Sequence, residues 1–399
     1  MRVGDRFHLT YCSNIHPGET WSAVDGALRA SLPRIRGLLG LDGPMGVGLR
    51  LSAAAAESLD HPEAIATFRA FLRDGDYYVF TINGFPYGAF HGERVKEQVY
   101  LPDWRTQARL GYTNRLASIL ATLLDGMNGI EGSVSTVPGG FRSALRGEAD
   151  VRAIAANMLR HAAHLVTLRA RTGSTLTLAI EPEPACFIEN TDDALDFFNR
   201  FLFDSESIAQ VARETGVRMG VEEVRRHIGI CLDACHVAVE FEDPLVVLAR
   251  FRAAGIRLCK IQVSSALRLE GLDASGLLSA LERFAEDTYL HQVVERTDGQ
   301  LVQYLDLPQA LAAAAQAPSL RREWRVHFHV PVFLPALPLC DTTQRELSIL
   351  LHALKDQPDC PYLEVETYTW DVLPAEHRTS DMCTAIAREL SWTRSIIEQ

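Results

Sequence analysis

The sequence predicts an α/β protein of the (β/α)8 TIM-barrel class with insertions. Short runs rich in β-branched and aromatic residues end in polar residues, and long segments with apolar residues at helical spacing separate them. This alternation is typical of repeated βα units around a parallel sheet. The chain has 399 residues, and a barrel of this class uses about 250 residues or more as one unit. We therefore predict a single domain over residues 1–399.

Nine runs have the composition of strands. They span residues 7–12, 46–52, 77–84, 132–140, 176–184, 229–236, 257–265, 325–333 and 361–370. Since a barrel of this class has eight strands, we expect one of the nine runs to belong to an insertion.

The segments between the runs carry helix signals. Apolar residues recur every three to four positions over residues 149–171, and Gly173 supplies a stop. Asn190 begins a capped and negatively charged first turn. Residues 244–254 and 380–397 predict a short helix and a C-terminal helix.

Two segments interrupt the alternation of strands and helices. Residues 291–307 form two alternating runs around Asp298-Gly299, which is a strong signal for a β-hairpin. We predict that this hairpin is inserted before the run at 325–333. A long loop also follows the third strand from Asn83 onwards, and a loop of this size at a barrel mouth usually has a functional role.

Composition indicates which partners and which cellular compartment to expect. Lysine and arginine total 39 against 51 aspartates and glutamates, a net charge of −12, which opposes binding to a nucleic-acid backbone. The start of the chain has no signal-peptide pattern, and no apolar run is long enough for a membrane span. The eight cysteines lie far apart and predict no disulfide framework. We expect a soluble cytoplasmic protein without nucleic-acid binding or membrane insertion.

Coordinating side chains stand near the ends of the late strands. These residues are Glu181, Asp233, Gln262, His329 and Glu366. In a parallel barrel the carboxyl ends of the strands converge on one face, where the active site is built. Such an oxygen-rich set suits Mn²⁺, Mg²⁺, Co²⁺ or Fe²⁺, and Zn²⁺ stays open as an alternative.

Strand alternation predicts a second layer beneath this set. Glu364 shares a face with Glu366, and Lys260 shares one with Gln262. A buried Glu364 needs a cation or a hydrogen-bond donor, and either His327 or Lys260 is the expected partner.

Asp233 and His236 form an Asp-x-x-His element at a strand end. One interpretation places both side chains over the same pocket, with Asp233 as a metal ligand and His236 as a second ligand or a substrate-binding group. The alternative is that Asp233 caps the next helix and His236 lies on its surface.

At these residues the sequence resembles the xylose isomerase-like TIM-barrel superfamily, which includes sugar isomerases, ketose 3-epimerases, inosose dehydratases and endonuclease IV. The matching residues are Glu181 in LAIEPEP, Asp233 and His236 in CLDACH, and Glu366 in LEVET. The resemblance implies a divalent-metal site. It also implies a His on strand seven, where this chain has Gln262. Three alternatives stay open: Gln262 binds the metal, His329 replaces the missing ligand, or Lys260 pairs with the carboxylates in place of a metal.

More closely, the sequence resembles the metabolite traffic protein EboE family. The segments that carry this resemblance are TINGFPYGAFHGERVKEQVYLPDW, CLDACHVAVEFEDP, KIQVSSAL, VHFHVPVF and LEVETYTW. That family belongs to a bacterial operon for making or exporting a specialised metabolite. The resemblance implies a small-molecule metabolite as ligand and pathway proteins as partners.

Further side chains are candidates for holding the substrate. They are Tyr87, His91 and Lys96 in the long loop, with His236, Lys260 and Trp370 near the late strands. For Tyr87 an equally supported alternative is that the side chain packs the loop. For Trp370 the alternative is that the side chain packs the core.

Together these residues predict an isomerase- or epimerase-like enzyme acting on a polyol, ketose or cyclitol. Glu181 and Glu366 would exchange a substrate proton, with His236 as a further proton carrier. A non-catalytic metabolite carrier with the same pocket is the alternative. A phosphodiesterase resembling endonuclease IV is disfavoured by the acidic charge and by Thr81, Asn83 and Thr136 at positions that would need histidines.

Overall fold

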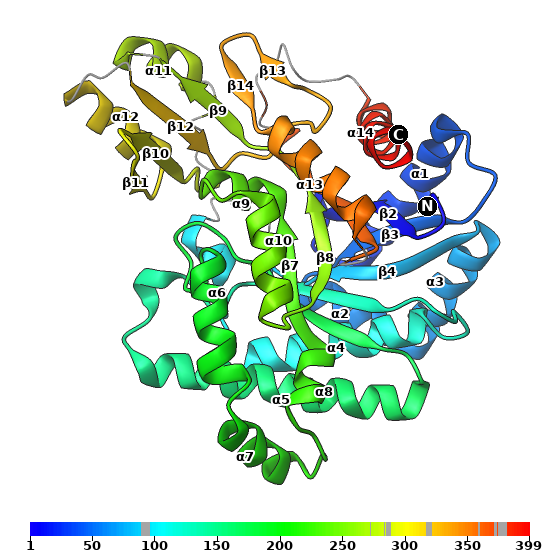
Figure 1. Ribbon diagram of the computed structural model, residues 1–399. Coiled ribbons are helices and arrows are strands. Elements are labelled where there is room, and N and C mark those ends of the chain that lie inside the picture. The colour runs from blue at the N-terminus through cyan, green and yellow to red at the C-terminus, as the bar shows by residue number, and fades with distance from the viewer. Residues whose placement is uncertain are drawn as a thin grey trace.

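The computed structural model describes residues 1–88, 96–271, 273–282, 284, 289–316, 321–357, 360–370, 373 and 381–399 (Figure 1). Among these residues, nine strands form the barrel sheet. They are β1 (Arg2–Val3), β2 (Phe7–Tyr11), β3 (Met45–Arg50), β4 (Tyr77–Asn83), β5 (Gly132–Thr136), β6 (Leu176–Ile180), β7 (Ile228–Asp233), β8 (Leu258–Val263) and β15 (Tyr362–Val365).

The order of the strands is β1-β2-β15-β8-β7-β6-β5-β4-β3. Strands β2 to β8 and β15 pair in parallel where they are neighbours in this order, and β1 pairs with β2 in the antiparallel direction. A single parallel bridge between Cys12 and Gly48 connects β2 to β3. The nearly closed barrel confirms the predicted fold class, with eight of the nine predicted runs as its parallel strands.

Gly48 explains why β2 and β3 approach so closely at the bridge. A Cβ atom at this position would lie 1.9 Å from Oε1 of Glu364 and 2.6 Å from the backbone oxygen of Tyr11. Both separations are shorter than carbon and oxygen tolerate, so the position requires glycine.

Helices cover the outside of the barrel. They are α1 (Trp21–Leu39), α2 (Ala53–Leu59), α3 (Pro62–Asp74), α4 (Gln107–Leu123), α5 (Glu148–Thr172), α6 (Thr191–Phe197), α7 (Ser205–Thr215), α8 (Val221–His227), α9 (Ala234–Val239), α10 (Pro244–Ala253), α13 (Gln344–Asp356) and α14 (Met382–Glu398). Short 3₁₀ segments stand at Ser13–Ile15, Lys96–Tyr100 and Arg142–Ala144, and a π-helical turn at Phe198–Leu202 follows α6. In the described part of the chain, no helix is long and apolar enough to cross a membrane.

The predicted helices form where the capping signals indicate. Helix α5 ends at Gly173, which is left-handed, and the Asn190 side chain accepts a hydrogen bond from the backbone of Asp193 at the start of α6. Helices α10 and α14 match the predictions at 244–254 and 380–397 within two residues at each end. Helix α14 packs against α1, so both ends of the chain lie on one side of the barrel (Figure 1).

The insertion between β8 and α13 is larger than a hairpin. It holds a second, antiparallel sheet in the order β11-β10-β12-β9-β14-β13. Its elements are β9 (Leu267–Glu270), α11 (Ala274–Leu281), β10 (Val293–Thr297), β11 (Gln300–Tyr304), α12 (Leu307–Gln316), β12 (Arg322–Val326), β13 (Ala336–Leu337) and β14 (Cys340–Thr342). Figure 1 shows this sheet at one end of the barrel, next to α9.

The hairpin prediction is confirmed inside this sheet. Strands β10 and β11 pair around Asp298 and Gly299, and both turn residues have positive φ values, 48° and 81°. The run at 325–333 is the extra one, because β12 pairs with β9 and β10 rather than with the barrel. Strand β12 ends at Val326, so His327 and His329 lie beyond the strand rather than within it.

Candidate metal centre

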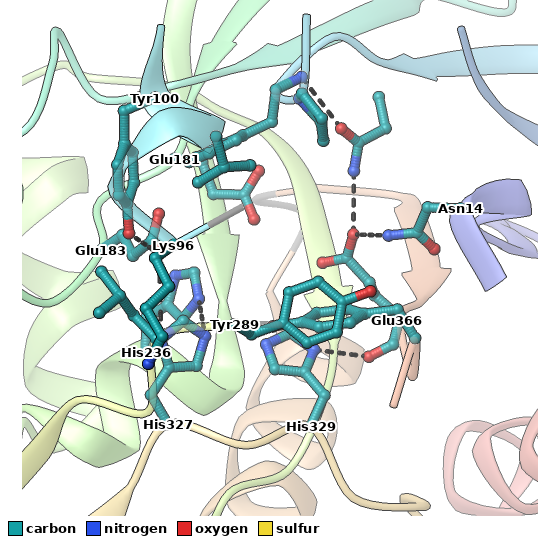
Figure 2. A pocket seen from close by; sticks show the side chains of 16 residues that line it. Asn14, Lys96, Tyr100, Glu181, Glu183, His236, Tyr289, His327, His329 and Glu366 are labelled. Atoms are coloured by element: carbon teal, nitrogen blue, oxygen red, sulfur yellow. Dashed lines mark hydrogen bonds and ion pairs between the residues drawn. The ribbon is translucent and has the colours of Figure 1, made fainter. Parts of the chain in front are cut away.

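A pocket lies where the carboxyl ends of the barrel strands meet the insertion. Its empty volume is about 580 Å³. The lining side chains are Asn14, Asn83, Phe85, Pro86, Lys96, Val99, Tyr100, Glu181, Glu183, His236, Tyr289, Leu290, His327, His329, Glu366 and Tyr368 (Figure 2). Carboxylates and imidazoles dominate its charged lining, as the strand-end positions predict.

Three carboxylates from separate strands converge at the carboxyl ends of the barrel strands, and two of them, Glu181 and Glu366, line this pocket. Glu181 follows β6, Asp233 ends β7 and Glu366 follows β15. One oxygen of each carboxylate lies within 4.8 Å of the others, and all three side chains are buried. The barrel thus brings together residues that are up to 185 positions apart in the chain (366 − 181).

Two of the three carboxylates have a buried oxygen without a hydrogen-bond partner among the described residues. The Nδ2 atoms of Asn14 and Asn83 donate to Oε1 of Glu366, at 2.8 and 2.9 Å. Glu181 Oε2 and Asp233 Oδ2 are buried and find no hydrogen-bond partner within the described residues. Buried carboxylate oxygens that lack a donor are costly, so these atoms are arranged for a bound group.

Asp233 combines the two roles that its sequence position offers. Its Oδ1 accepts from the backbone N–H of His236 at 2.9 Å, and this bond caps α9. The same oxygen accepts from the hydroxyl of Ser264 at 2.8 Å. Its Oδ2 is buried and lies 3.9 Å from Nε2 of His329, which lines the pocket. Helix capping therefore fixes the orientation of the carboxylate without using the oxygen that a metal would need.

The cluster is electrostatically unfavourable without a cation. Burial raises the pKa of Glu181 well above its usual value, and the charge of Asp233 raises it further. The pKa of Glu366 is raised in the same way by burial and by the charges of Glu181 and Asp233. A divalent cation would relieve both effects, because it stabilises the ionised form of each carboxylate. The residues present therefore fit a divalent metal ion.

Three histidines lie near the carboxylates, and each ring is held by a hydrogen bond at its Nδ1 atom. Nδ1 of His236 lies 2.8 Å from the Pro182 carbonyl oxygen, and Nδ1 of His329 lies 2.7 Å from that of Glu366. Nδ1 of His327 lies 2.8 Å from the side-chain oxygen of Gln292. Since each acceptor lacks a proton, each Nδ1 donates, and each Nε2 presents a lone pair. A hydrogen bond from the other ring nitrogen, which fixes the orientation of the imidazole, is typical of histidines that bind metals.

Glu183 was not predicted as a site residue and lies beside two of these histidines, His236 and His327. The hydroxyl of Tyr100 donates to its Oε1 at 2.8 Å, and burial raises its pKa to about 8. A signal existed in the sequence, since Glu183 stands two residues after Glu181 and alternate residues at a strand end face the same way. The predicted run at 176–184 includes Glu183, without a role assigned to it.

The layer below the pocket is an ion pair between Lys260 and Glu364. Nζ of Lys260 lies 2.5 Å from Oε2 of Glu364, and neither side chain is exposed. The structure thus selects Lys260 over His327 as the partner of Glu364. It also corrects the expectation that Lys260 binds substrate, because the amine lies beneath the pocket and does not belong to its described lining.

Gln262 is level with Asp233 and Glu364 in the barrel ladders. It is fully buried, and neither its Oε1 nor its Nε2 has a hydrogen-bond partner in the described part of the chain. Among the described side chains it does not line the pocket. His329, whose Nε2 is also buried and unpartnered among the described residues, reaches the pocket instead.

Of the predicted side chains in the long loop after β4, two belong to the described residues, and one of these lines the pocket. Lys96 lines the pocket, and its Nζ lies 2.5 Å from Oδ2 of Asp306 in the insertion. Tyr87 instead packs edge-on against Tyr112, with ring centroids 5.0 Å apart, so the packing alternative holds for this residue. His91 lies outside the described residues.

Trp370 also lies away from the described pocket lining. Its side chain is buried, and it is close enough to Glu389 on α14 to lower the pKa of that carboxyl, which burial raises to about 7. The aromatic residues that reach the pocket are Tyr100, Tyr289 and Tyr368, and the ring of Tyr368 lies 4.8 Å from that of His329.

Comparison with known proteins shows similarity in structure. A scan of protein-family models and a search of curated proteins give no match. Among solved structures, a xylose isomerase-like TIM barrel protein from Mycobacterium smegmatis in complex with magnesium is similar, with a TM-score of 0.51 and 10% identity over 100% of this chain and 99% of that chain.

Two other solved structures are similar at lower scores. The probable 3-DHS dehydratase AsbF from Bacillus anthracis, involved in petrobactin synthesis, has a TM-score of 0.46 and 10% identity over 96% of this chain and 97% of that chain. The IOLI protein with a binding zinc atom has a TM-score of 0.46 and 13% identity over 98% of both chains. At such identities the similarity concerns the fold. The protein therefore has the fold of the xylose isomerase-like TIM barrels.

Proposed function

We propose that this protein is a divalent-metal-dependent, isomerase- or epimerase-like enzyme that acts on a small polyhydroxylated metabolite. The observation that carries the proposal is the convergence of Glu181, Asp233 and Glu366, with one oxygen of each within 4.8 Å of the others in a buried pocket. His329 is the expected fourth ligand, because its Nε2 lies 3.9 Å from Oδ2 of Asp233. Mn²⁺, Mg²⁺, Co²⁺, Fe²⁺ and Zn²⁺ are all compatible with this donor set.

A divalent cation held there would polarise a carbonyl or hydroxyl oxygen of the substrate and so acidify the neighbouring C–H bond. Glu181 and Glu366 come from opposite sides of the pocket and would take and return the proton at the substrate carbon. The amides of Asn14 and Asn83 hold Glu366 in position for the transfer.

The pocket favours a neutral, hydroxyl-rich ligand over an anion. Lys96 is paired with Asp306, and the other acidic and basic side chains of the described lining are three carboxylates and three histidines. The ring of Tyr368 beside His329 offers an apolar surface for a sugar-like face. We further propose, on the segments that resemble the EboE family, that the metabolite belongs to a specialised biosynthesis or export pathway.

Solvent exchange tests the proposal without knowledge of the product. The metal-free protein, reloaded with Mn²⁺, is incubated in D₂O with a panel of ketoses, aldoses and inososes, and deuterium incorporation at carbon is followed by NMR. We expect at least one compound to exchange. Glu181→Gln and Glu366→Gln should each lower the exchange rate by at least 100-fold, in the range that general acid–base groups contribute.

Glu389→Gln is the matched control, since Glu389 is an equally buried carboxylate that lies outside the described pocket lining. It should keep the wild-type exchange rate. A panel compound that binds the protein but never exchanges, in wild type and variants alike, would favour the non-catalytic metabolite carrier over the enzyme.

A further inference from the structure

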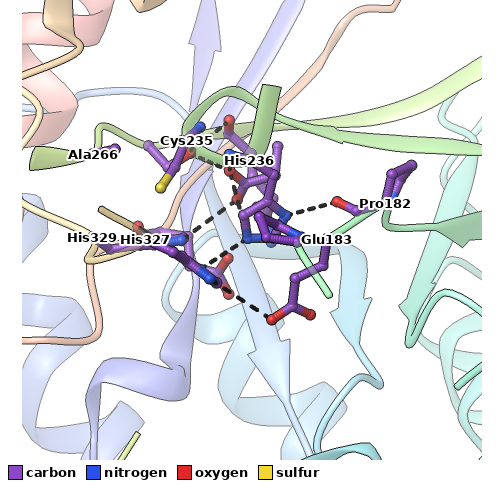
Figure 3. Close-up of polar contacts among 12 residues, drawn as sticks. Pro182, Glu183, Cys235, His236, Ala266, His327 and His329 are labelled. Carbon is purple, nitrogen blue, oxygen red and sulfur yellow. Dashed lines mark hydrogen bonds and ion pairs between the residues drawn. The ribbon is translucent and has the colours of Figure 1, made fainter. Parts of the chain in front are cut away.

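His236 and His327 face each other through their Nε2 atoms, which lie 3.1 Å apart (Figure 3). His236 is in α9 of the barrel, and His327 follows β12 of the insertion. Both imidazoles are buried. The contact thus joins two parts of the fold through two ring nitrogens.

The backbone sets the proton of His236. Its Nδ1 lies 2.8 Å from the carbonyl oxygen of Pro182, and a carbonyl oxygen can only accept. Nδ1 therefore carries the proton, and Nε2 of the neutral ring has a lone pair.

Gln292 sets the proton of His327 in the same way. The Nε2 atom of Gln292 donates to the Pro184 carbonyl oxygen and to the Tyr100 hydroxyl oxygen, both at 3.2 Å. Turning the amide round would place two acceptors against each other at Pro184. The side-chain oxygen of Gln292 therefore faces Nδ1 of His327 at 2.8 Å, and this Nδ1 is the donor.

The two facing Nε2 atoms consequently present two lone pairs to each other. Lone pairs at 3.1 Å repel, so a positive charge is required between or beside them. Two nitrogens bound to one ion at about 2.1 Å each, at angles between octahedral and tetrahedral, lie about 3.0 to 3.4 Å apart. The observed separation of 3.1 Å matches this range.

Glu183 completes a third side of this position. One of its carboxylate oxygens and a ring nitrogen of each histidine lie within 4.8 Å of one another, and all three side chains are buried. Glu183 Oε1 lies 3.9 Å from Nδ1 of His327, the nitrogen that donates to Gln292, so this contact places the carboxylate beside the ring and not at Nε2. Cys235 forms a competing group with His327 and His329, but that group needs a thiolate, which burial disfavours.

We propose that Glu183, His236 and His327 bind a second divalent cation, separate from the one expected at Glu181, Asp233 and Glu366. Two imidazoles and one carboxylate make a nitrogen-rich donor set, which suits Zn²⁺ and similar first-row metals, whereas the carboxylate-rich set of the first site also suits Mg²⁺ or Mn²⁺. Because His327 belongs to the insertion and the other two ligands to the barrel, this cation fixes the insertion over the barrel mouth. The inference does not depend on any turnover at the other site.

Metal stoichiometry and hydrogen exchange test this proposal. The chelator-treated full-length protein is reloaded with excess Zn²⁺, desalted and measured by mass spectrometry of the metal. We expect about two zinc ions per chain in the wild type and one in His327→Ala and in Glu183→Gln. Zinc should also slow amide exchange in residues 291–304 of the wild type but not of these variants. Thermal melts of the metal-free proteins establish that the variants fold.

His164→Ala is the control, since His164 contacts Ser118 and Asn114 away from the pocket, and it should keep both ions and the slowed exchange. Two zinc ions in both His327→Ala and Glu183→Gln would overturn the inference. So would a wild type that binds one zinc ion and loses it in Glu366→Gln. The proposed function has a separate outcome, because retention of both ions by Glu181→Gln and Glu366→Gln would contradict it while leaving the second site intact.

Discussion

Lys260 and Glu364 form an ion pair inside the barrel, with 2.5 Å between Nζ and Oε2 and no exposure of either side chain. Ser135 adds a hydroxyl at 3.1 Å from the same Nζ. Burial alone would lower the pKa of Lys260, but Glu364 raises it above its usual value, so the amine stays charged. The pair lies beneath the carboxylates of the pocket, and its positive and negative charges neutralise each other.

Removing one partner of this pair should destabilise the protein strongly. We expect Lys260→Met to lower the free energy of unfolding by about 3 to 5 kcal/mol, because Glu364 is left buried and unpaired. The double variant Lys260→Met/Glu364→Gln should recover a large part of that loss. Urea denaturation of the two variants measures both values, and equal losses in the single and double variants would contradict this assignment.

Gly48 should tolerate no side chain, because a Cβ atom there meets Oε1 of Glu364 and the backbone of Tyr11. Gly48→Ala is expected to cost about 1 to 3 kcal/mol of stability through overpacking. The matched control is Gly26→Ala in α1, where the added Cβ has open space. Alanine there should be neutral or stabilising by up to about 1 kcal/mol, since it favours a helix interior. Similar effects of the two substitutions would refute this interpretation of the bridge.

One part of the pH dependence of stability should come from the buried carboxyl of Glu389, beside the other buried carboxyls such as Glu183. Burial raises its pKa from 4.5 to about 7. The folded protein therefore holds a proton that the unfolded chain has released, and the stability present below about pH 4.5 is lost as the pH rises through about 7. In Glu389→Gln the free energy of unfolding should fall by roughly 3 kcal/mol less than in the wild type as the pH rises through this range.

Urea denaturation in the presence of a chelator, at several values between about pH 5 and pH 8, measures this slope. Glu206→Gln on the exposed face of α7 is the control and should reproduce the wild-type slope. If Glu389→Gln and the wild type give parallel curves, Glu389 does not hold the extra proton.

Lys96 and Asp306 should hold the segment after β4 against the insertion. The pair is partly buried, and Oδ1 of Asp306 also accepts from the backbone N–H groups of His291 and Leu307. Asp306→Asn keeps an oxygen for those N–H groups but removes the charge. We expect amide exchange in residues 96–100 to become a few-fold faster, since such pairs contribute about 1 kcal/mol or less. Asp74→Asn, in an exposed pair with Arg73, should leave this segment unchanged.

The carboxylate site was predictable because it depends on topology alone. Once the runs are placed in a parallel barrel, Glu181, Asp233 and Glu366 must converge, since each stands at or just after a strand end. Alternation along β15 likewise placed Glu364 one layer deeper than Glu366. The Asp298-Gly299 turn fixed the hairpin through the positive φ values that it requires.

The histidine group was not predictable from periodicity. His327 reaches His236 because the insertion docks over the barrel, and strand pairing in the second sheet decides that docking. The positions of Tyr87 and Trp370 were also not predictable from the sequence. Both follow strands that point at the pocket, yet packing against Tyr112 and a place beside Glu389 turn them away from it.

The position of a bound cation tests the central claim most directly. Crystals of the full-length protein grown with Mn²⁺ would be measured for anomalous scattering near the metal absorption edge. The account predicts a peak bounded by carboxylate oxygens of Glu181, Asp233 and Glu366, within about 2.3 Å of each. Density that shows these three carboxylates turned apart, with no anomalous peak between them at saturating Mn²⁺, would contradict it.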